Sequence, residues 1–256
     1  MVSERYTHYA AAMTSSTILN VPVFAGQGTQ AAKSVATRQQ AHNDASTVLG
    51  SLLLKACYEA FTKEVSSLTP EELIGIRLYP ADFPTPESLI DLPAERYDGN
   101  AVISGTTLFL IQSLRYLAYV ESTATNTGSL TPFTDILNTN IENQLGIVGF
   151  SSGVLTACLV ASSQTALAYL THGVEVYRLA FWIGVRSQQY RINSLESASI
   201  PLKWHTEPWS QVIIGLDIAA VSEYISKYHE SVRCSQVIAI ILPVLTPFFR
   251  TRRAKA

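Results

Sequence analysis

A serine between two glycines stands where the chain could carry a nucleophile. Gly149, Ser151 and Gly153 form a Gly-x-Ser-x-Gly motif. The apolar stretch 145–148 before it predicts a short strand, and the apolar run 154–161 after it predicts a helix. A turn between such elements holds the serine in a sparsely populated backbone conformation and exposes its Oγ at the top of a sheet. Small residues are needed at both glycine positions because the strand and the helix pass close together there.

A nucleophile that attacks a carbonyl also needs donors for the developing oxyanion. The predicted helix begins just after Ser151, so its N-terminal N–H groups and positive dipole end would lie beside the serine. A second glycine turn, Gly26-Gln27-Gly28-Thr29, follows an early predicted strand at 19–24. Such a turn can aim backbone N–H groups into a cleft. Alone this turn is a weak signal, because glycine-rich turns are common. The pair, about 120 residues apart, resembles the acyltransferases of fatty-acid and polyketide synthesis.

Elements that would position these turns alternate along the chain. Alternation of strands and helices favours an α/β domain with a largely parallel sheet. The patterns predict strands at 19–24, 145–148 and 209–215, helices at 45–64, 101–121, 153–161, 164–190 and 217–229, and loops at 79–99 and 122–135. The 164–190 helix is expected to break near His172-Gly173.

Composition narrows the class of protein. The 256 residues are 47% apolar and 15% charged, which suits one large domain with a sizeable core. A net charge of −2 gives no general electrostatic reason to expect nucleic acid as a partner. Three scattered cysteines suggest neither a disulfide framework nor a metal site, and they suit a reducing compartment. With no secretory leader or clear membrane span in the pattern, we expect a cytoplasmic protein without a membrane partner.

Several further segments carry a family resemblance in a fixed order. They are 19–29, 53–64, 114–117, 181–186 and 208–210, and the similarity runs from about Leu19 to about His229. In this order they resemble the starter-unit acyl-carrier-protein transacylase domain of fungal non-reducing polyketide synthases. The resemblance implies an acyltransferase core of the α/β-hydrolase-like kind, with a mostly parallel sheet and a small ferredoxin-like subdomain.

The activity implied by this resemblance is a ping-pong acyl transfer. A starter acyl group would pass from coenzyme A, or from a carrier protein, to the nucleophile. It would then pass to the phosphopantetheine thiol of an acyl carrier protein, next to the other polyketide synthase domains. The family implies no bound cofactor and no metal; acyl-CoA and the carrier's phosphopantetheine enter as substrates.

The same resemblance assigns roles to individual residues. Ser151 falls at the nucleophile position, where most members of the family carry cysteine. The backbone N–H groups of Gln27 and Ser152 are implied as oxyanion donors. Arg186 matches the region where malonyl transferases keep an arginine for a substrate carboxylate. A structural ion pair on a helix is the alternative reading of Arg186.

The chain departs from the family pattern in two ways: the histidine that acts as general base is not found, and the resemblance fades toward the C-terminus. The family's general base is a histidine, and none of the five histidines (His8, His42, His172, His205 and His229) stands in that motif. All five fit surface or capping positions better than a general base, so the base is unknown; His205, in the segment 203–207, is the runner-up candidate because of its aromatic, polar neighbours. After about Ser231 the resemblance fades, so we expect a lead-in at 1–18, the transferase domain at 19–231, and a divergent tail at 232–256. The small subdomain would then be incomplete, which predicts a truncated domain.

Two other functions stay open on the sequence. Without its base the domain could be a catalytically impaired remnant that docks a carrier protein. A serine esterase of the α/β-hydrolase kind would share the Gly-x-Ser-x-Gly motif, although the His-Gly-Gly motif often found upstream in that family is not present.

Overall fold

The structure is a computed structural model, and it describes residues 21–26, 35–91, 96–97, 99–142, 146–197, 222–223 and 226–227. The chain divides into two units, Met1–Glu207 and Pro208–Ala256. In the second unit the four described residues are helical, and Lys227 Nζ lies 2.6 Å from Glu223 Oε1. The elements described below belong to the first unit.

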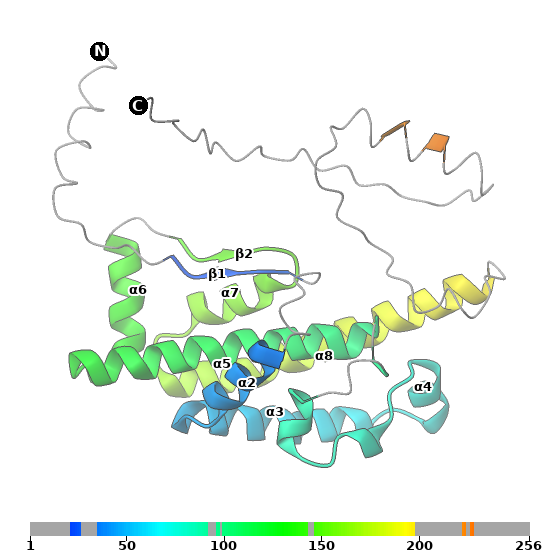
Figure 1. Ribbon diagram of the computed structural model, residues 1–256, viewed down its shortest axis with the longest axis horizontal. Coiled ribbons are helices and arrows are strands. Elements are labelled where there is room, and N and C mark those ends of the chain that lie inside the picture. The colour runs from blue at the N-terminus through cyan, green and yellow to red at the C-terminus, as the bar shows by residue number, and fades with distance from the viewer. Residues whose placement is uncertain are drawn as a thin grey trace. The chain divides into compact units, whose positions relative to one another are not determined.

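Three long helices form the core of the first unit: α3 (Val48–Ser66), α5 (Ala101–Thr127) and α8 (Ala166–Ser197). They run side by side along the unit in Figure 1. Each buries an apolar stripe at helical spacing. Its members include Leu53, Cys57 and Phe61 on α3, Leu110, Leu114 and Leu117 on α5, and Tyr169, Tyr177 and Phe181 on α8. The predicted helices at 45–64 and 101–121 are confirmed by α3 and α5.

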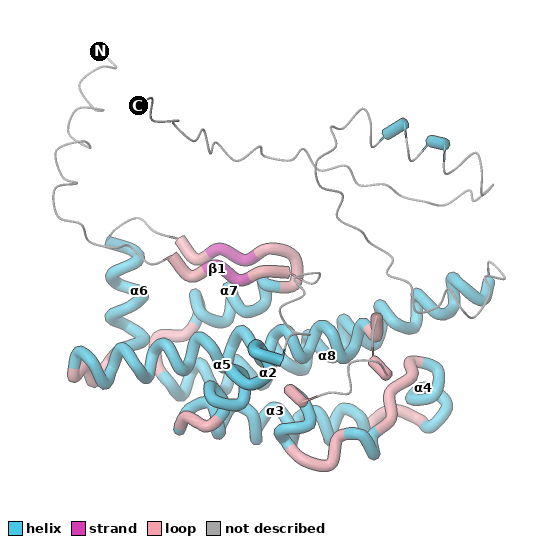
Figure 2. The backbone as a smooth tube through the Cα atoms, in the orientation of Figure 1, coloured by secondary structure: helices cyan, strands magenta, loops and turns pink. Residues whose placement is uncertain are grey.

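The strands and a short helix form a second layer against this core. β1 (Val23–Phe24) pairs in parallel with β2 (Val148–Gly149), with Val23 opposite Val148. α7 (Gly153–Ser162) contacts both strands as well as α5 and α8. Figure 2 shows the strand pair on the far side of α7 from the long helices. The described part of the chain is therefore mostly helical, with a small parallel sheet.

Shorter elements cover the edges of the core. α2 (Val35–Ala45) is tied to α5 by an ion pair in which Arg115 Nε lies 2.7 Å from the buried carboxylate of Asp44. The remaining elements are α4 (Pro70–Gly75), the 3₁₀ turns η2 (Pro80–Asp82) and η3 (Pro86–Leu89), and α6 (Pro132–Glu142). The two 3₁₀ turns lie within the predicted loop 79–99.

The predicted loop at 122–135 is wrong. α5 continues to Thr127, ends at Gly128 in the left-handed conformation, and α6 begins at Pro132. Thr123, Thr125 and Thr127 each donate a hydroxyl hydrogen bond to the carbonyl one turn earlier. Polar residues of this kind usually favour turns, but here their side chains are satisfied along the helix.

The predicted break at His172-Gly173 is also wrong, because α8 continues through it. Gly173 is buried, and a Cβ placed there would lie 3.0 Å from Cδ1 of Leu53 on α3. The glycine therefore leaves room for the Leu53 side chain rather than forming a turn. Tertiary packing compensates for its low helix propensity.

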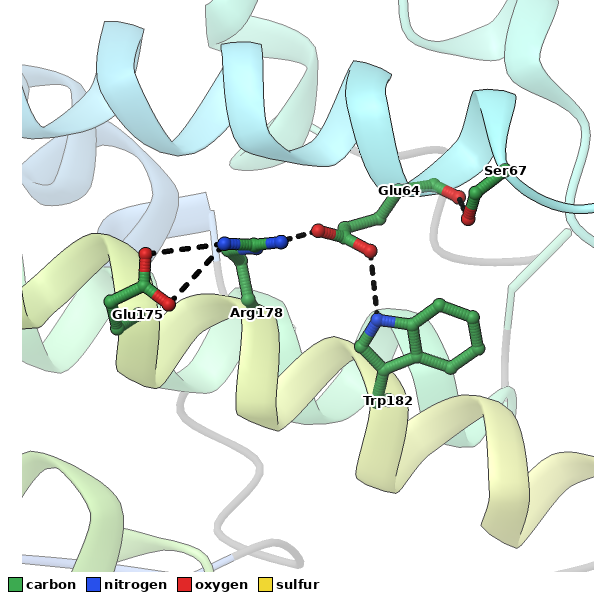
Figure 3. Close-up of polar contacts among 5 residues, drawn as sticks. All are labelled: Glu64, Ser67, Glu175, Arg178 and Trp182. Atoms are coloured by element: carbon green, nitrogen blue, oxygen red, sulfur yellow. Dashed lines mark hydrogen bonds and ion pairs between the residues drawn. The ribbon is translucent and has the colours of Figure 1, made fainter.

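A buried carboxylate joins α3 to α8, as Figure 3 shows. Glu64 accepts hydrogen bonds from Arg178 Nε (2.5 Å) and from the indole N–H of Trp182 (2.8 Å). Arg178 also pairs with Glu175 on its own helix. Burial acts to raise the pKa of Glu64, but the two hydrogen bonds and the charge of Arg178 outweigh it and hold that pKa below its usual value.

α5 is long and apolar enough, by length and composition, to cross a membrane. Most of its apolar residues are buried against α8, α3 and α7, so core packing accounts for that composition. The predicted strand at 209–215 lies outside the described residues, as does most of the predicted helix at 217–229. The ferredoxin-like subdomain expected there remains a prediction.

Candidate active site

Ser151 lies in a tight turn between β2 and α7. Its φ is +54°, in the left-handed region that residues other than glycine rarely adopt. The surroundings fix this conformation: the Phe150 N–H donates to the carbonyl of Phe24 at 2.9 Å, and α7 starts two residues later. The side chain is exposed. The motif predicts an exposed serine in a sparsely populated backbone conformation, and the structure confirms both properties.

Both motif glycines are required by close packing of strand and helix. A Cβ at Gly149 would lie 2.6 Å from Val154 Cα and 2.8 Å from Ala157 Cβ. A Cβ at Gly153 would lie 2.6 Å from the carbonyl carbon of Phe24. Real Cβ atoms essentially never come so close to backbone atoms. The small residues therefore let α7 start directly against β1 and β2.

Gly26, the first residue of the early glycine motif, lies against Ser151. A Cβ at Gly26 would lie 2.5 Å from Ser151 Cβ and 3.1 Å from Ser151 Oγ. Because β1 and β2 are parallel, their carboxyl ends meet at one edge of the sheet, and the residues after each strand become neighbours. The first residue of the early motif is thus brought against Ser151 of the second motif. Gln27 itself lies outside the described residues.

The first turn of α7 sets the electrostatics beside the serine. Ser152 is the N-cap, and the next N–H groups point back: Gly153 donates to Phe150 O at 3.0 Å and Val154 to Ser151 O at 3.1 Å. The positive end of the helix dipole therefore lies next to Ser151. This is the environment in which the Ser152 N–H would act as an oxyanion donor; that role stays a prediction.

Gln112 on α5 is a site residue to which the sequence analysis gives no role. Its Nε2 donates to the carbonyl of Ala25 at 2.7 Å, and its Oε1 accepts from the hydroxyl of Thr156 at 3.1 Å. It thereby joins the turn after β1 to α7. The available signal was a neutral polar side chain among apolar neighbours on the helix; Gln112 is half-buried, and a polar group that loses part of its contact with water favours a partner in the protein.

For the two histidines in the described part of the chain, no contact with Ser151 is recorded. His42 on α2 lies 3.9 Å from Asp91, and His172 is exposed on α8. His205, the candidate base, lies outside the described residues. Among the residues that the structure describes, no group of three His, Cys, Asp or Glu side chains could hold a metal ion.

Arg186 is exposed on α8 and contacts its own helix. Its Nη1 donates to Gln189 Oε1 at 3.0 Å, and its guanidinium carbon lies 5.8 Å from the ring centroid of Trp182. Both contacts are local and involve no carboxylate. A contact with substrate remains a prediction for this residue.

Comparison with known proteins adds the family. The family described as starter unit:ACP transacylase in aflatoxin biosynthesis matches residues 23–242. Orsellinic acid synthases of Armillaria mellea and Armillaria ostoyae are each 45% identical over 214 residues, which is 83% of this chain. An orsellinic acid synthase of Beauveria bassiana is 28% identical over 213 residues. The chain spans 9% of the length of each of these relatives, and no solved structure matches it.

Proposed function

The chain belongs to the starter-unit acyl-carrier-protein transacylase family, which is an acyltransferase family, and we propose that Ser151 is its acyl-carrying nucleophile. One observation carries the proposal: the exposed serine sits at φ +54° with Gly26 packed against it at the start of a helix. That arrangement supports Ser151 as the nucleophile, because an exposed serine in a strand–turn–helix elbow at a helix N-terminus is the geometry that acyl transfer uses.

The first half-reaction loads the enzyme. Ser151 Oγ attacks the thioester carbonyl carbon of acyl-CoA, and its proton passes to a general base. The N–H groups of Gln27 and Ser152 hold the oxyanion of the tetrahedral intermediate. The intermediate collapses with cleavage of the carbon–sulfur bond. Coenzyme A leaves as its thiol after taking the proton back from the base, and the acyl group stays on Ser151 as an ester.

The second half-reaction unloads it. The phosphopantetheine thiol of an acyl carrier protein loses its proton to the base and attacks the ester carbonyl. The carbon–oxygen bond to Ser151 then breaks, and the serine recovers its proton. The product is an acyl thioester on the carrier. The relatives named orsellinic acid synthase, of which this chain spans 9%, support a place in polyketide biosynthesis beside other synthase domains.

A serine needs more help from a base than a cysteine would, because its hydroxyl is far less acidic. His205 is the proposed candidate for that base. Its replacement by alanine should slow acylation about a hundredfold or more. His172→Ala, an exposed histidine on α8, is the matched control and should leave the rate unchanged. An unchanged rate in His205→Ala would remove His205 from the mechanism.

The experiment that tests the proposal is direct acylation. Wild-type protein and Ser151→Ala are each incubated with labelled acetyl- or hexanoyl-CoA, with and without holo carrier protein. We expect a label on the peptide that contains Ser151, its transfer to the carrier, and neither event in Ser151→Ala. Intact-protein mass spectrometry reads both steps.

The same experiment separates the competing functions. Label that is released only to water, with a carrier present, would indicate an esterase and overturn the transfer step. No acyl-enzyme at all would indicate a remnant that docks a carrier protein. Equal labelling of Ser151→Ala would place the nucleophile elsewhere.

A further inference from the structure

We propose that Gln112 is a positioning residue of the acyl-transfer site, which it serves by fixing the turn after β1 relative to Ser151. This inference rests on the proposed function of Ser151. The side chain comes from α5, outside both sequence motifs. Its amide contacts one residue on each side of the nucleophile: Ala25 in the turn after β1, and Thr156 in the second turn of α7.

Both polar atoms of the Gln112 amide form hydrogen bonds, one as a donor and the other as an acceptor. The Nε2 donates to the Ala25 carbonyl at 2.7 Å, while the Oε1 accepts from Thr156 Oγ at 3.1 Å. Thr156 is fully buried, so its hydroxyl needs a partner within the protein, and Gln112 provides one. The glutamine amide offers both a donor and an acceptor at this reach. A glutamate of the same shape would place a carboxylate oxygen against the Ala25 carbonyl.

The contact controls the backbone that leads to the proposed oxyanion donor. Fixing the Ala25 carbonyl fixes the plane of the Ala25–Gly26 peptide, because the peptide unit is planar. Gly26 follows, and it has the widest backbone freedom of any residue. Two contacts restrict that freedom. Gln112 holds the carbonyl of the preceding residue, and Ser151 packs so closely that a Cβ on Gly26 would lie 2.5 Å from the Cβ of Ser151. The next peptide carries the N–H of Gln27.

The size of the expected effect follows from what the turn does. Loss of an oxyanion donor costs about 10²–10³ in rate, and a displacement of about 1 Å can cost about 10². Gln112→Glu should therefore slow acylation of Ser151 by roughly 10- to 100-fold. The acyl-CoA concentration at half-saturation should change less than about threefold, because the donor acts on the transition state rather than on ground-state binding.

Variants of Thr156 test the other half of the contact. Thr156→Val keeps the shape and removes the hydroxyl, and should slow acylation about fivefold, the rate equivalent of one neutral hydrogen bond. Thr156→Ser keeps the hydroxyl and should restore most of the rate. Gln39→Glu, an exposed residue of α2, is the matched control for a glutamine-to-glutamate change and should behave as wild type.

The experiment combines two measurements on the full chain. Single-turnover acylation with labelled acetyl-CoA gives the rate and the half-saturation concentration. Amide hydrogen exchange gives the protection of a peptide that covers 21–26, compared with a peptide from α3. For Gln112→Glu we expect a slower rate, near-constant half-saturation, and faster exchange in 21–26 only.

Failure of this inference differs from failure of the proposed function. Normal acylation and normal exchange in Gln112→Glu, with Ser151→Ala inactive, would overturn the inference and leave the nucleophile in place. Faster exchange throughout the protein would show a general structural role and also overturn it. A wild-type protein that forms no acyl-enzyme would overturn both, whatever the exchange of 21–26.

Discussion

At the scale of single residues, Ser151 is held in its conformation by its surroundings. A left-handed conformation costs an L-residue about 1–2 kcal/mol, and at Ser151 the β2 pairing and the start of α7 impose it. A side chain at position 151 therefore lowers stability relative to glycine, and we attribute its presence to function. The two effects can be separated by substitution.

We predict that Ser151→Gly is more stable than Ser151→Ala by about 1 kcal/mol, although neither can be acylated. Glycine relieves the strain, while alanine removes the hydroxyl and keeps the Cβ. The greater freedom of glycine in the unfolded chain reduces the gain but does not reverse it. Urea unfolding followed by circular dichroism measures the difference, and equal stabilities would contradict a strained elbow.

The residues that the sequence could predict are those whose role is local. Gly149, Ser151 and Gly153 lie in one pentapeptide, and each follows from the geometry of a strand–turn–helix. The contacts of Gln112 with Ala25 and Thr156 join segments far apart in the chain. Nothing in the local pattern around Gln112 specifies that meeting; it depends on how α5 crosses the sheet.

At the scale of elements, packing overrode local preference in two places. Periodicity placed α3 and α5 well, because their apolar stripes repeat at helical spacing, and the apolar run after the elbow placed α7. The polar end of α5 was predicted as a loop, yet its threonine hydroxyls are satisfied within the helix. Gly173 was predicted to break α8, yet it gives space to Leu53. Propensity describes a residue alone, whereas these two cases depend on its neighbours.

The contact between α3 and α8 predicts a pH dependence. Glu64 has a folded-state pKa below its unfolded value of about 4.3, so its contribution is fully present above that value. The contribution is lost as the pH falls through the lower, folded pKa. Glu64→Gln should destabilise the protein by about 1–3 kcal/mol at pH 7, the range for hydrogen bonds to a charged group. That difference should shrink below about pH 4.

Glu175→Gln is the matched control for this change. Glu175 is exposed and contacts the same Arg178, so its loss should cost less than about 0.5 kcal/mol at any pH. Unfolding curves of the three proteins between pH 3 and pH 8 give the comparison. A Glu64→Gln difference that stays constant down to pH 3 would contradict the assigned direction of the pKa.

At the scale of the first unit, α5 serves core stability at its start and the site near its middle. Near its start, Ala101 and Val102 pack against Gly184 of α8. Ten residues later, Gln112 contacts the turn after β1. At 1.5 Å per residue these two places are about 15 Å apart along the helix. A change at the first place should therefore act on folding and leave the second intact.

Gly184→Ala tests this separation. A Cβ there would lie 2.5 Å from Val102 Cα and 2.9 Å from the Ala101 carbonyl oxygen, and backbone atoms cannot easily move away. Overpacking costs about 1–3 kcal/mol, and the better helix propensity of alanine returns up to about 1 kcal/mol. We expect a net loss of about 1–2 kcal/mol, or a Tm lower by about 2–8 °C.

The same substitution at Gly75 should have the opposite sign. Gly75 ends α4 with no atom near its Cβ position, so Gly75→Ala should be neutral or stabilising by up to about 1 kcal/mol. Single-turnover acylation by the folded fraction should match wild type in both variants. A slower acylation rate in folded Gly184→Ala would mean that α5 transmits packing changes from its start to Gln112, and that the core and the site are not independent.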